Sequence, residues 1–371
     1  MRPPPEFDAA VVGAGPAGCA AAIACARSGQ RVALVERATF PRRRAGETLH
    51  PGAETVLRAL GVFDSVVAAR FLRHEGVLVS WGKPAHFQSY GSDRVARWRG
   101  FQAWRAELDA ILLKRACDCG AAVLQPCRAL HPLLGDGGRV TGVHTSAGDV
   151  RARWTIDAGG GGHWLARELG LGLEHRSPSL IARYGYAVGQ LPALKRGPQL
   201  DAEPWGWTWI AQVRRELLHW VRLAFTAGIG NGHDGPPATI AHLDGDGKVY
   251  GADVSWRLAP QAAGPGYLAV GDAAAVLDPA SSHGVLRALL SGMASATVVS
   301  RGLEPKRGAE HFAQLMRSGF ERDLERLRAL YAELPFPPSW LGAAVRPRPV
   351  GATQVPGREE ERPRVAWSNP A

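Results

Sequence analysis

The chain alternates short apolar runs with longer segments of helical periodicity, a pattern typical of α/β proteins with a parallel sheet. Residues 9–12 form an apolar run that is too short for a helix and predicts a buried strand. A helix is expected over 16–27 and a second strand over 31–35. The same patterning predicts helices over 51–61, 105–120 and 165–169, and strands over 121–124, 140–145 and 150–156.

A different pattern follows in the middle of the chain. Residues 180–258 are strand-like and rich in aromatic side chains, with expected strands over 205–213, 217–225 and 249–256. Short strands are also expected within 76–98, and helical periodicity returns over 285–297 and 308–334. The fold class predicted is α/β, a Rossmann-like domain with a parallel sheet, interleaved with an antiparallel β-sheet substrate domain and followed by a helical C-terminal part.

These patterns divide the chain into interleaved segments. The nucleotide-binding domain is expected to combine residues 1–75, 100–175 and 262–335, and the substrate-binding β domain to combine 76–99 and 176–261. Residues 336–371 are rich in Pro and Arg without periodicity, so little fixed structure is expected there.

The first strand leads into a glycine-rich turn with the spacing G-x-G-x-x-G, formed by Gly13, Gly15 and Gly18. In this motif the first glycine permits a tight turn, the second lets the backbone approach a pyrophosphate, and the third lets the helix pack closely on the strand. The helix begins at Pro16 and Ala17, so its N-terminal N–H groups would hold the phosphates.

An acidic residue ends the second strand, where a ribose-binding carboxylate belongs in such a unit. This residue is Glu36, and Arg37 follows it. A carboxylate at this place favours a free ribose hydroxyl over a 2′-phosphate, but it does not distinguish NAD from FAD.

A second strand-and-turn signal occurs far along the chain, where Gly271 and Asp272 follow the apolar residues 267–270. The stretch from there to Gly284 is polar and glycine-terminated, which suits a loop lying against a flat ring. Together, the two distant turns predict that one chain holds the long dinucleotide FAD from both ends.

Composition and charge limit the classes of function. The 371 residues suffice for one large or two medium domains, and the formal net charge is +10. The arginines are scattered, with no basic stripe interleaved with aromatics, so nucleic-acid binding is not expected, whereas an acidic partner or anionic substrate stays open. No apolar run is long enough to span a bilayer, and no signal peptide is expected before the first strand.

The five cysteines, at 19, 25, 117, 119 and 127, are an odd number on expected helices and a strand edge. This disfavours a disulfide framework, and a cytoplasmic location is expected. Cys117 and Cys119 have the spacing of a metal or redox pair, but no second cluster completes it, so no metal site is expected.

Four motifs resemble the FAD-dependent monooxygenase family of the para-hydroxybenzoate hydroxylase type, which includes flavin-dependent halogenases and geranylgeranyl reductases. They are the G-x-G-x-x-G turn, the loop 42–49, Asp157-Ala158-Gly159, and Gly271-Asp272 with its sequel 277–285. The resemblance covers roughly residues 7–330. Ala158 replaces the usual glycine of the third motif, and a purely structural role for Asp157 stays open.

The resemblance implies which residues hold FAD. The aspartate of the Gly-Asp pair binds the flavin ribitol, and the 279–285 stretch lays backbone N–H groups against the isoalloxazine ring, where a helix begins. Arg44 and Thr48 match the loop that crosses the flavin, and Arg105 matches an arginine that contacts the cofactor. The expected FAD-binding residues are Gly13, Gly15, Pro16, Ala17, Gly18, Glu36, Arg37, Arg44, Thr48, Arg105, Gly271, Asp272, Pro279, Gly284 and Val285.

Halogenases of this family carry a lysine near the flavin and a Trp-x-Trp-x-Ile-Pro stretch. The stretch is only partly present over 205–211, with Ala211 in place of the proline. The lysine is expected two residues before Trp81, where this chain has Val79, and no halogenase C-terminal extension is expected. Halogenation is therefore an alternative and not the leading prediction.

The leading prediction is hydroxylation of an aromatic substrate through a flavin C4a-hydroperoxide formed with O2, as the resemblance implies. His283 is the candidate for chemistry because it lies in the flavin-facing loop, although an ordinary loop histidine is an open alternative. The expected substrate-lining residues are Tyr184, Tyr186, Trp207, Trp209 and His219. Tryptophans in such a sheet more often belong to its core than to a substrate platform, so a core position is the alternative for Trp207 and Trp209.

Donor and partner stay open within this prediction. The sequence has no second glycine fingerprint that could hold NAD(P)H separately. The electron donor is therefore either NAD(P)H or a separate flavin reductase. One branch of the family hydroxylates tryptophan on a partner protein during quinone cofactor formation, so the substrate is either a small aromatic molecule or a tryptophan of an acidic partner. A geranylgeranyl-reductase-like enzyme and a non-catalytic flavin-binding protein are the remaining alternatives.

Overall fold

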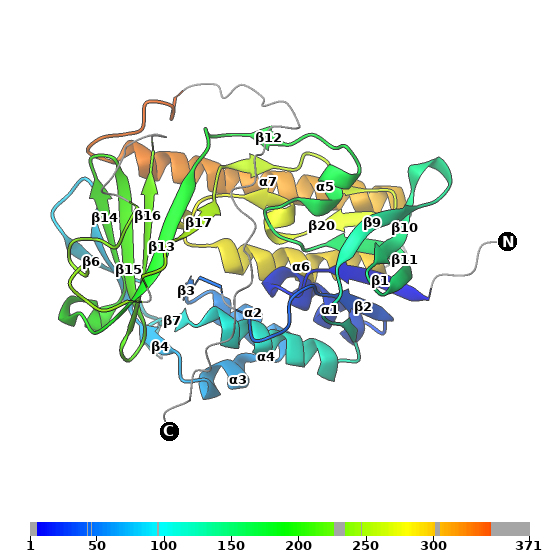
Figure 1. Ribbon diagram of the computed structural model, residues 1–371, viewed down its shortest axis with the longest axis horizontal. Coiled ribbons are helices and arrows are strands. Elements are labelled where there is room, and N and C mark those ends of the chain that lie inside the picture. The colour runs from blue at the N-terminus through cyan, green and yellow to red at the C-terminus, as the bar shows by residue number, and fades with distance from the viewer. Residues whose placement is uncertain are drawn as a thin grey trace.

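The computed structural model describes residues 6–42, 44–45, 47–94, 96–225, 234–245, 247–300 and 305–342. A mainly parallel sheet lies at one end of the molecule and a mainly antiparallel sheet at the other (Figure 1). The long helix α7 (Pro305–Ala332), orange in Figure 1, extends along both. The predicted α/β fold class is confirmed.

The parallel sheet is built around the first strand of the chain. β1 (Phe7–Val12) lies between β2 (Val32–Val35) and β11 (Gly148–Asp157). The remaining strands are β8 (Ala122–Leu124), β20 (Tyr267–Ala269), β19 (Ala263–Gly264), β9 (Ala129–Leu134) and β10 (Val140–Thr145). The parallel order is β20-β11-β1-β2-β8, and Ala9, Ala10 and Val11 are fully buried, as expected for a central parallel strand.

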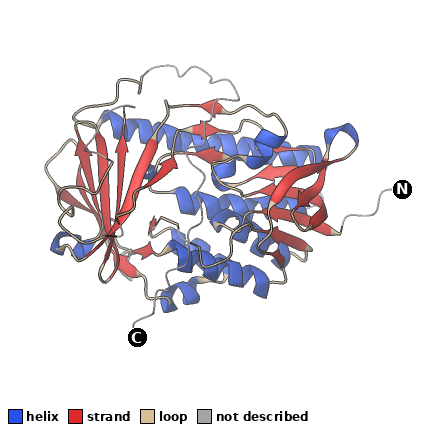
Figure 2. Cartoon of the chain, viewed as in Figure 1, coloured by secondary structure: helices blue, strands red, loops and turns tan. Residues whose placement is uncertain are grey.

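Most helices gather around this sheet, as Figure 2 shows in blue. They are α1 (Pro16–Arg27), α2 (Ala53–Leu60), α3 (Phe63–Ala68), α4 (Arg105–Asp118), α5 (Trp164–Glu168) and α6 (Gly284–Ser300). α1 has the bounds that the sequence predicted. It packs closely on α6, because a Cβ atom at Gly292 would lie only 2.2 Å from the Ala17 carbonyl oxygen.

The second large sheet has seven strands in the order β17-β13-β16-β15-β14-β5-β6. Its strands are β5 (Gly76–Ser80), β6 (His86–Ser89), β13 (Ile181–Val188), β14 (Gln199–Glu203), β15 (Gly206–Arg214), β16 (Leu217–Ala224) and β17 (Tyr250–Asp253). Pairing is antiparallel except between β14 and β5. Because side chains alternate along each strand, the register places Tyr186 beside His219, and Val221 between Tyr184 and Trp209, on one face.

The strand predicted over 249–256 is shorter in the structure and ends at Asp253. The Asp253 carboxylate accepts hydrogen bonds from the backbone N–H and hydroxyl of Ser255, at 2.9 and 2.6 Å. This local side-chain bonding turns the chain and ends the ladder.

The remaining strands form two small sheets. They consist of β3 (Glu47–Leu49), β7 (Gly100–Ala103) and β4 (Leu72–His74), and of β12 (Glu174–His175), β18 (Arg257–Leu258) and β21 (Ala275–Val276). Short 3₁₀ segments are η1 (Asp136–Gly138), η2 (Pro192–Arg196), η3 (Gly271–Ala273) and η4 (Pro279–Ser281). The predicted domain boundaries stay a prediction.

Residues 336–342 were expected to begin a tail with little fixed structure, yet they pack on the core. The Trp340 ring lies 5.1 Å from that of Trp256, and its Nε1 donates to the Phe225 carbonyl oxygen at 3.2 Å. The rest of the expected tail lies outside the described residues. Within the described ranges, no helix is both long and apolar enough to cross a bilayer.

Candidate functional site

An elongated cleft of about 820 Å³ separates the glycine-rich turn from the antiparallel sheet. Two of the expected FAD-binding residues, Gly18 and Gly271, do not line it. The residues from that set that do line it are Gly13, Gly15, Pro16, Ala17, Glu36, Arg37, Arg44, Thr48, Arg105, Asp272, Pro279, Gly284 and Val285. The two distant turns therefore open onto one cavity.

The three glycines of the first turn are required for different reasons. Gly13 has a φ of +98°, and a Cβ atom there would lie 2.6 Å from the Ala158 carbonyl oxygen. A Cβ atom at Gly18 would lie 1.8 Å from the Gly13 carbonyl oxygen. At Gly15, by contrast, the nearest contact would be Arg42 Nη2 at 3.4 Å, an ordinary distance. The fold does not need Gly15, whereas a phosphate approaching the backbone would, so this turn fits a dinucleotide.

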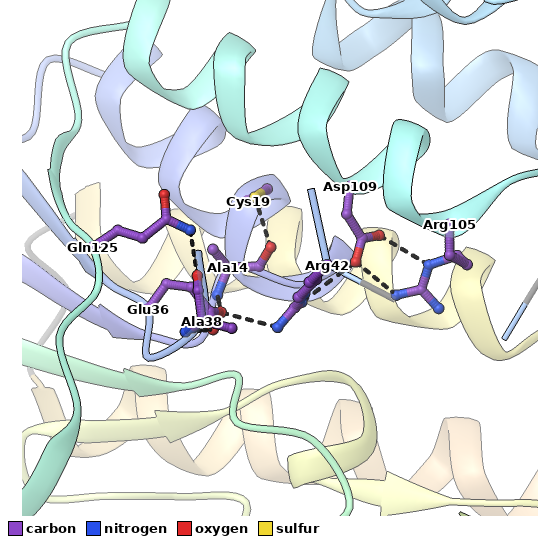
Figure 3. Close-up of polar contacts among 8 residues, drawn as sticks. All are labelled: Ala14, Cys19, Glu36, Ala38, Arg42, Arg105, Asp109 and Gln125. Carbon is purple, nitrogen blue, oxygen red and sulfur yellow. Dashed lines mark hydrogen bonds and ion pairs between the residues drawn. The ribbon is translucent and has the colours of Figure 1, made fainter. Parts of the chain in front are cut away.

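Glu36 is buried at the end of β2 and already has three protein donors, as Figure 3 shows. The backbone N–H groups of Ala14 and Ala38 each donate to its carboxylate at 2.8 Å, and Arg42 Nη1 lies 3.1 Å from it. The carboxylate holds the glycine-rich turn against the second strand. It also lines the cleft, and its contact with a ribose stays a prediction.

Charges alternate from Glu36 into helix α4 (Figure 3). Arg42 also pairs with Asp109 at 3.3 Å, and Asp109 accepts from Arg105 at 2.9 and 3.2 Å. We call Glu36, Arg42, Asp109 and Arg105 the charge chain. Arg42 was expected only as the start of a loop, and the pairing of Asp109 was missed, although the i,i+4 spacing of Arg105 and Asp109 on a predicted helix was a usable signal.

Positive charge is concentrated at this end of the cleft. Arg37, Arg44 and Arg105 line it together with Arg42. Burial, followed by the neighbouring charges of Arg42, Arg105 and Arg37, lowers the pKa of Arg44. Such a cluster favours an anionic ligand, and a pyrophosphate has the required charge. Thr48 Oγ1 donates to Gln102 Oε1 at 2.9 Å, which fixes the strand leaving this loop.

Another wall of the cleft begins at the second turn. Gly271 has a φ of +57° and its N–H donates to Ser291 Oγ at 2.9 Å, so the turn is fixed on α6. The Asp272 carboxylate opens into the cleft, yet the surrounding protein raises its pKa by desolvation, against the opposing effects of Arg287, Arg105 and Arg257. Helix α6 begins at Gly284, where a Cβ atom would meet nothing within 4 Å. The positive end of this helix therefore faces open cleft.

A buried polar network supports this wall, and sequence reasoning missed it. The Asp278 carboxylate accepts from Trp256 Nε1 at 2.6 Å, from the Tyr331 hydroxyl at 2.8 Å and from the Ala280 N–H at 2.9 Å. The Tyr331 hydroxyl in turn accepts from Trp207 Nε1 at 2.7 Å. Burial raises the pKa of Asp278 to about 6. The network ties η4, α7 and the antiparallel sheet together across residues distant in the sequence.

The antiparallel sheet supplies the aromatic wall of the cleft. Tyr184, Trp207, Trp209 and His219 line it, whereas Tyr186 does not. The Tyr186 hydroxyl instead donates to the Arg44 carbonyl oxygen at 3.0 Å. Trp207 is 1% exposed and is held by Tyr331, so it is mainly core, as the sequence left open.

His283, the predicted candidate for chemistry, lies between two residues that line the cleft, Ser282 and Gly284. Its Nδ1 contacts the Ser281 carbonyl oxygen, and its ring centroid lies 5.5 Å from that of His50. His50 and Tyr90 line the cleft and pack edge to face at 5.1 Å, although no sequence pattern pointed to them. A chemical role for His283 stays a prediction.

The Asp157 motif has a structural role in the described chain. Its buried carboxylate accepts from the N–H groups of Gly159 and Leu165 at 2.8 and 2.9 Å. Arg257 Nη2 donates to the Gly161 carbonyl oxygen at 2.9 Å and so holds the other side of this glycine loop. The loop lines the cleft, and Asp157 fixes its shape.

Comparisons with known proteins agree with this geometry. The FAD binding domain family matches residues 6–215. Tryptophan 2-halogenase of Chondromyces crocatus is 29% identical over 334 residues, which cover 81% of this chain and 62% of the relative. Menaquinone reductase of Mycolicibacterium smegmatis is 30% identical over 332 residues, covering 80% of this chain and 76% of the relative.

A solved structure extends the likeness to three dimensions. The myxobacterial chondrochloren halogenase CndH superposes with a TM-score of 0.79 at 26% identity, covering 88% of this chain and 83% of the halogenase. The family match spans more than half of the chain and includes the glycine-rich turn, the charge chain and most of the aromatic wall. The chain therefore belongs to the FAD binding domain family, within the superfamily of FAD-dependent monooxygenases and halogenases.

Proposed function

We propose that the protein is an FAD-dependent monooxygenase that hydroxylates an aromatic substrate. The observation that carries this proposal is the composition of the cleft beyond the flavin-facing loop. Tyr184, Trp209 and His219 present aromatic side chains to the same cleft that is lined by Pro279, Gly284 and Val285. Aromatic side chains recognise aromatic ligands through stacked and edge-to-face contacts.

Hydroxylation is favoured over halogenation by the side chains that the cleft lacks. Among the described residues that line it, none is a lysine. Val79, at the position expected for the halogenase lysine, packs in the apolar cluster between the sheet and α7, and the nearby Lys83 is exposed. Halogenation stays the second candidate because a tryptophan 2-halogenase and a solved halogenase structure are similar to the chain.

The residues present fit FAD at both ends of the cleft. Bound FAD would supply the redox chemistry, accepting electrons from a donor and passing them to O2. The glycine-rich turn and the arginine cluster would hold the pyrophosphate, and Asp272 would bind the ribitol. The N-terminal end of α6 would stabilise negative charge on the ring. The aromatic wall would exclude water and orient the substrate ring.

Electron donor and natural substrate are part of the proposal. NAD(P)H is the proposed donor, either directly or through a separate reductase. The substrate is an aromatic small molecule, or a tryptophan side chain of an acidic partner protein drawn to the net charge of +10. Reduction of a prenyl chain is a further candidate, favoured by the likeness to a menaquinone reductase.

The test is reduction of the purified yellow protein, followed by exposure to O2. Rapid mixing with NADH or NADPH, with and without phenols and indoles, should bleach the flavin faster in the presence of a substrate. Reoxidation by O2 should then yield a product heavier by one oxygen atom. A brominated product formed only with bromide would favour halogenation, and saturation of a prenyl quinone without O2 would favour the reductase. Flavin binding with no turnover would leave a non-catalytic protein.

A further inference from the structure

Strand β16 carries a histidine whose ring nitrogens have no hydrogen-bond partner in the described part of the chain. His219 is 1% exposed, and neither Nδ1 nor Nε2 has a hydrogen-bond partner among the described residues. The buried histidines His74 and His163, by contrast, each have Nδ1 on a backbone carbonyl oxygen, at 3.3 and 2.9 Å. An unpaired buried polar group lowers the free energy of unfolding by about 1–3 kcal/mol. His219 therefore destabilises the fold unless a ligand forms a hydrogen bond with it.

The neighbours of His219 are aromatic rings that pack against the imidazole and form no hydrogen bond with its nitrogens. Tyr186 stacks on the imidazole at a centroid distance of 4.9 Å, and Tyr184 and Trp209 contact it edge-on at 5.9 and 5.3 Å. These rings fix the imidazole plane by packing. His219 also lines the cleft, so a molecule bound in the cleft lies next to this side chain.

We propose that His219 pairs with a hydrogen-bonding group attached directly to the substrate ring, and that the substrate is therefore a phenol or an indole. This inference rests on the proposed aromatic hydroxylation. The neutral imidazole offers one acceptor and one donor, which suits a ring O–H or N–H. Tyr184 and Trp209 would contact the ring of the substrate while His219 sets its rotation in the cleft.

The charge state of His219 further limits which classes of ligand could bind beside it. Burial lowers the pKa of this histidine to about 3. It therefore stays neutral near pH 7 and offers no positive charge to a carboxylate on the ring. A prenyl chain has no hydrogen-bonding group and would leave both nitrogens unpaired, so the same residue disfavours a hydrocarbon ligand at this place.

The experiment compares ring pairs that differ only at the hydrogen-bonding group. Phenol against anisole, and indole against 1-methylindole, are titrated into the FAD-loaded protein without donor, and binding is followed by the change in flavin absorbance. Wild type should bind the O–H or N–H member at least about tenfold more tightly, as expected for one net hydrogen bond of about 1.4 kcal/mol. His219→Phe should reduce each preference to about twofold or less.

Two further variants separate recognition from structure. His219→Phe should keep FAD and melt no lower than wild type, since it removes unpaired polar atoms from an aromatic setting. Trp209→Phe should weaken all four probes while retaining the preference. If His219→Phe does not fold, His219→Gln, which keeps a donor and an acceptor, should retain part of the preference in folded protein.

The outcomes distinguish this inference from the proposed function. An unchanged preference in folded His219→Phe, or no preference in wild type, would overturn the role of His219 even if phenols were hydroxylated. A preference that disappears with His219, in a protein that never transfers oxygen, would keep the role of His219 and overturn hydroxylation instead.

Discussion

The glycine-rich end of the cleft and its antiparallel sheet differ in how their buried polar side chains are paired. At the glycine-rich turn, Glu36 and Asp109 are buried, and Arg42 bridges them. At the antiparallel sheet, His219 is equally buried and neither ring nitrogen is paired within the described chain. Paired charges build the turn and hold it in place, whereas an unpaired buried group lowers the stability of the fold, which agrees with the proposed role of His219 in ligand binding. The comparison separates residues that shape the site from those that select its ligand.

The largest effect should come from breaking the charge chain. Arg42→Leu leaves Glu36 buried without its cation, so the free energy of unfolding should fall by about 3–5 kcal/mol. Denaturant titration checks this. Lys114→Ala is the matched control, because it removes an exposed pair with Asp118 on α4 and should cost less than about 0.5 kcal/mol. Equal losses in the two variants would contradict the structural role of Arg42.

The pH dependence of stability should report the titration of Asp278 in the buried network. Its pKa is raised from 3.8 to about 6 in the folded protein. Between these values the folded state binds more protons than the unfolded state, so the free energy of unfolding should fall by about 2–3 kcal/mol as pH rises from about 4 to about 6. Above that range this contribution should be constant.

The control for this prediction is Asp278→Asn, which removes the titration. Denaturant titrations of both proteins at several pH values should give curves that diverge between about pH 4 and pH 6. Parallel curves would mean that Asp278 does not retain its proton in the folded state.

At the glycine-rich turn, Gly15→Val should affect FAD binding but not folding. The fold leaves room at this position, so the variant should melt close to wild type but bind FAD at least about 100-fold more weakly, because the side chain blocks the approach of the pyrophosphate. Gly13→Ala should instead unfold at a lower temperature, since φ is +98° and the Ala158 oxygen is too close. Tight FAD binding by Gly15→Val would refute this placement of the pyrophosphate.

The smallest of these effects belongs to Tyr331→Phe. Trp207 Nε1 would lose its acceptor, which should cost about 1–2 kcal/mol in the free energy of unfolding without loss of FAD. Tyr267→Phe is the control, because the hydroxyl of Tyr267 has a long bond of 3.4 Å to Gln261 and its removal should cost about 0.5 kcal/mol or less. Similar losses would show that the Asp278 network adds no stability beyond ordinary packing.

How far the sequence could predict this site depends on the range of the interactions. The turn from Gly13 to Gly18 and the bounds of α1 follow from local spacing, and Gly15 and Glu36 could be placed in a cleft from that pattern. The bond between Trp207 and Tyr331 joins residues separated by 124 positions, and no local pattern encodes it. Trp207 and Trp209 look alike in the sequence, yet a hydroxyl from α7 places the first in the core. That His219 has no hydrogen-bond partner among the described residues depends on every neighbour, so only the folded chain reveals it.

The central claim is that one cleft holds FAD by both of its halves. Calorimetric titration of the flavin-free protein with FAD and with FMN, which lacks the adenylate half, tests it most directly. FAD should bind at least about 100-fold more tightly than FMN, because only FAD reaches both the glycine-rich turn and the N-terminal end of α6. FMN binding as tightly as FAD, or no binding of either, would contradict the account.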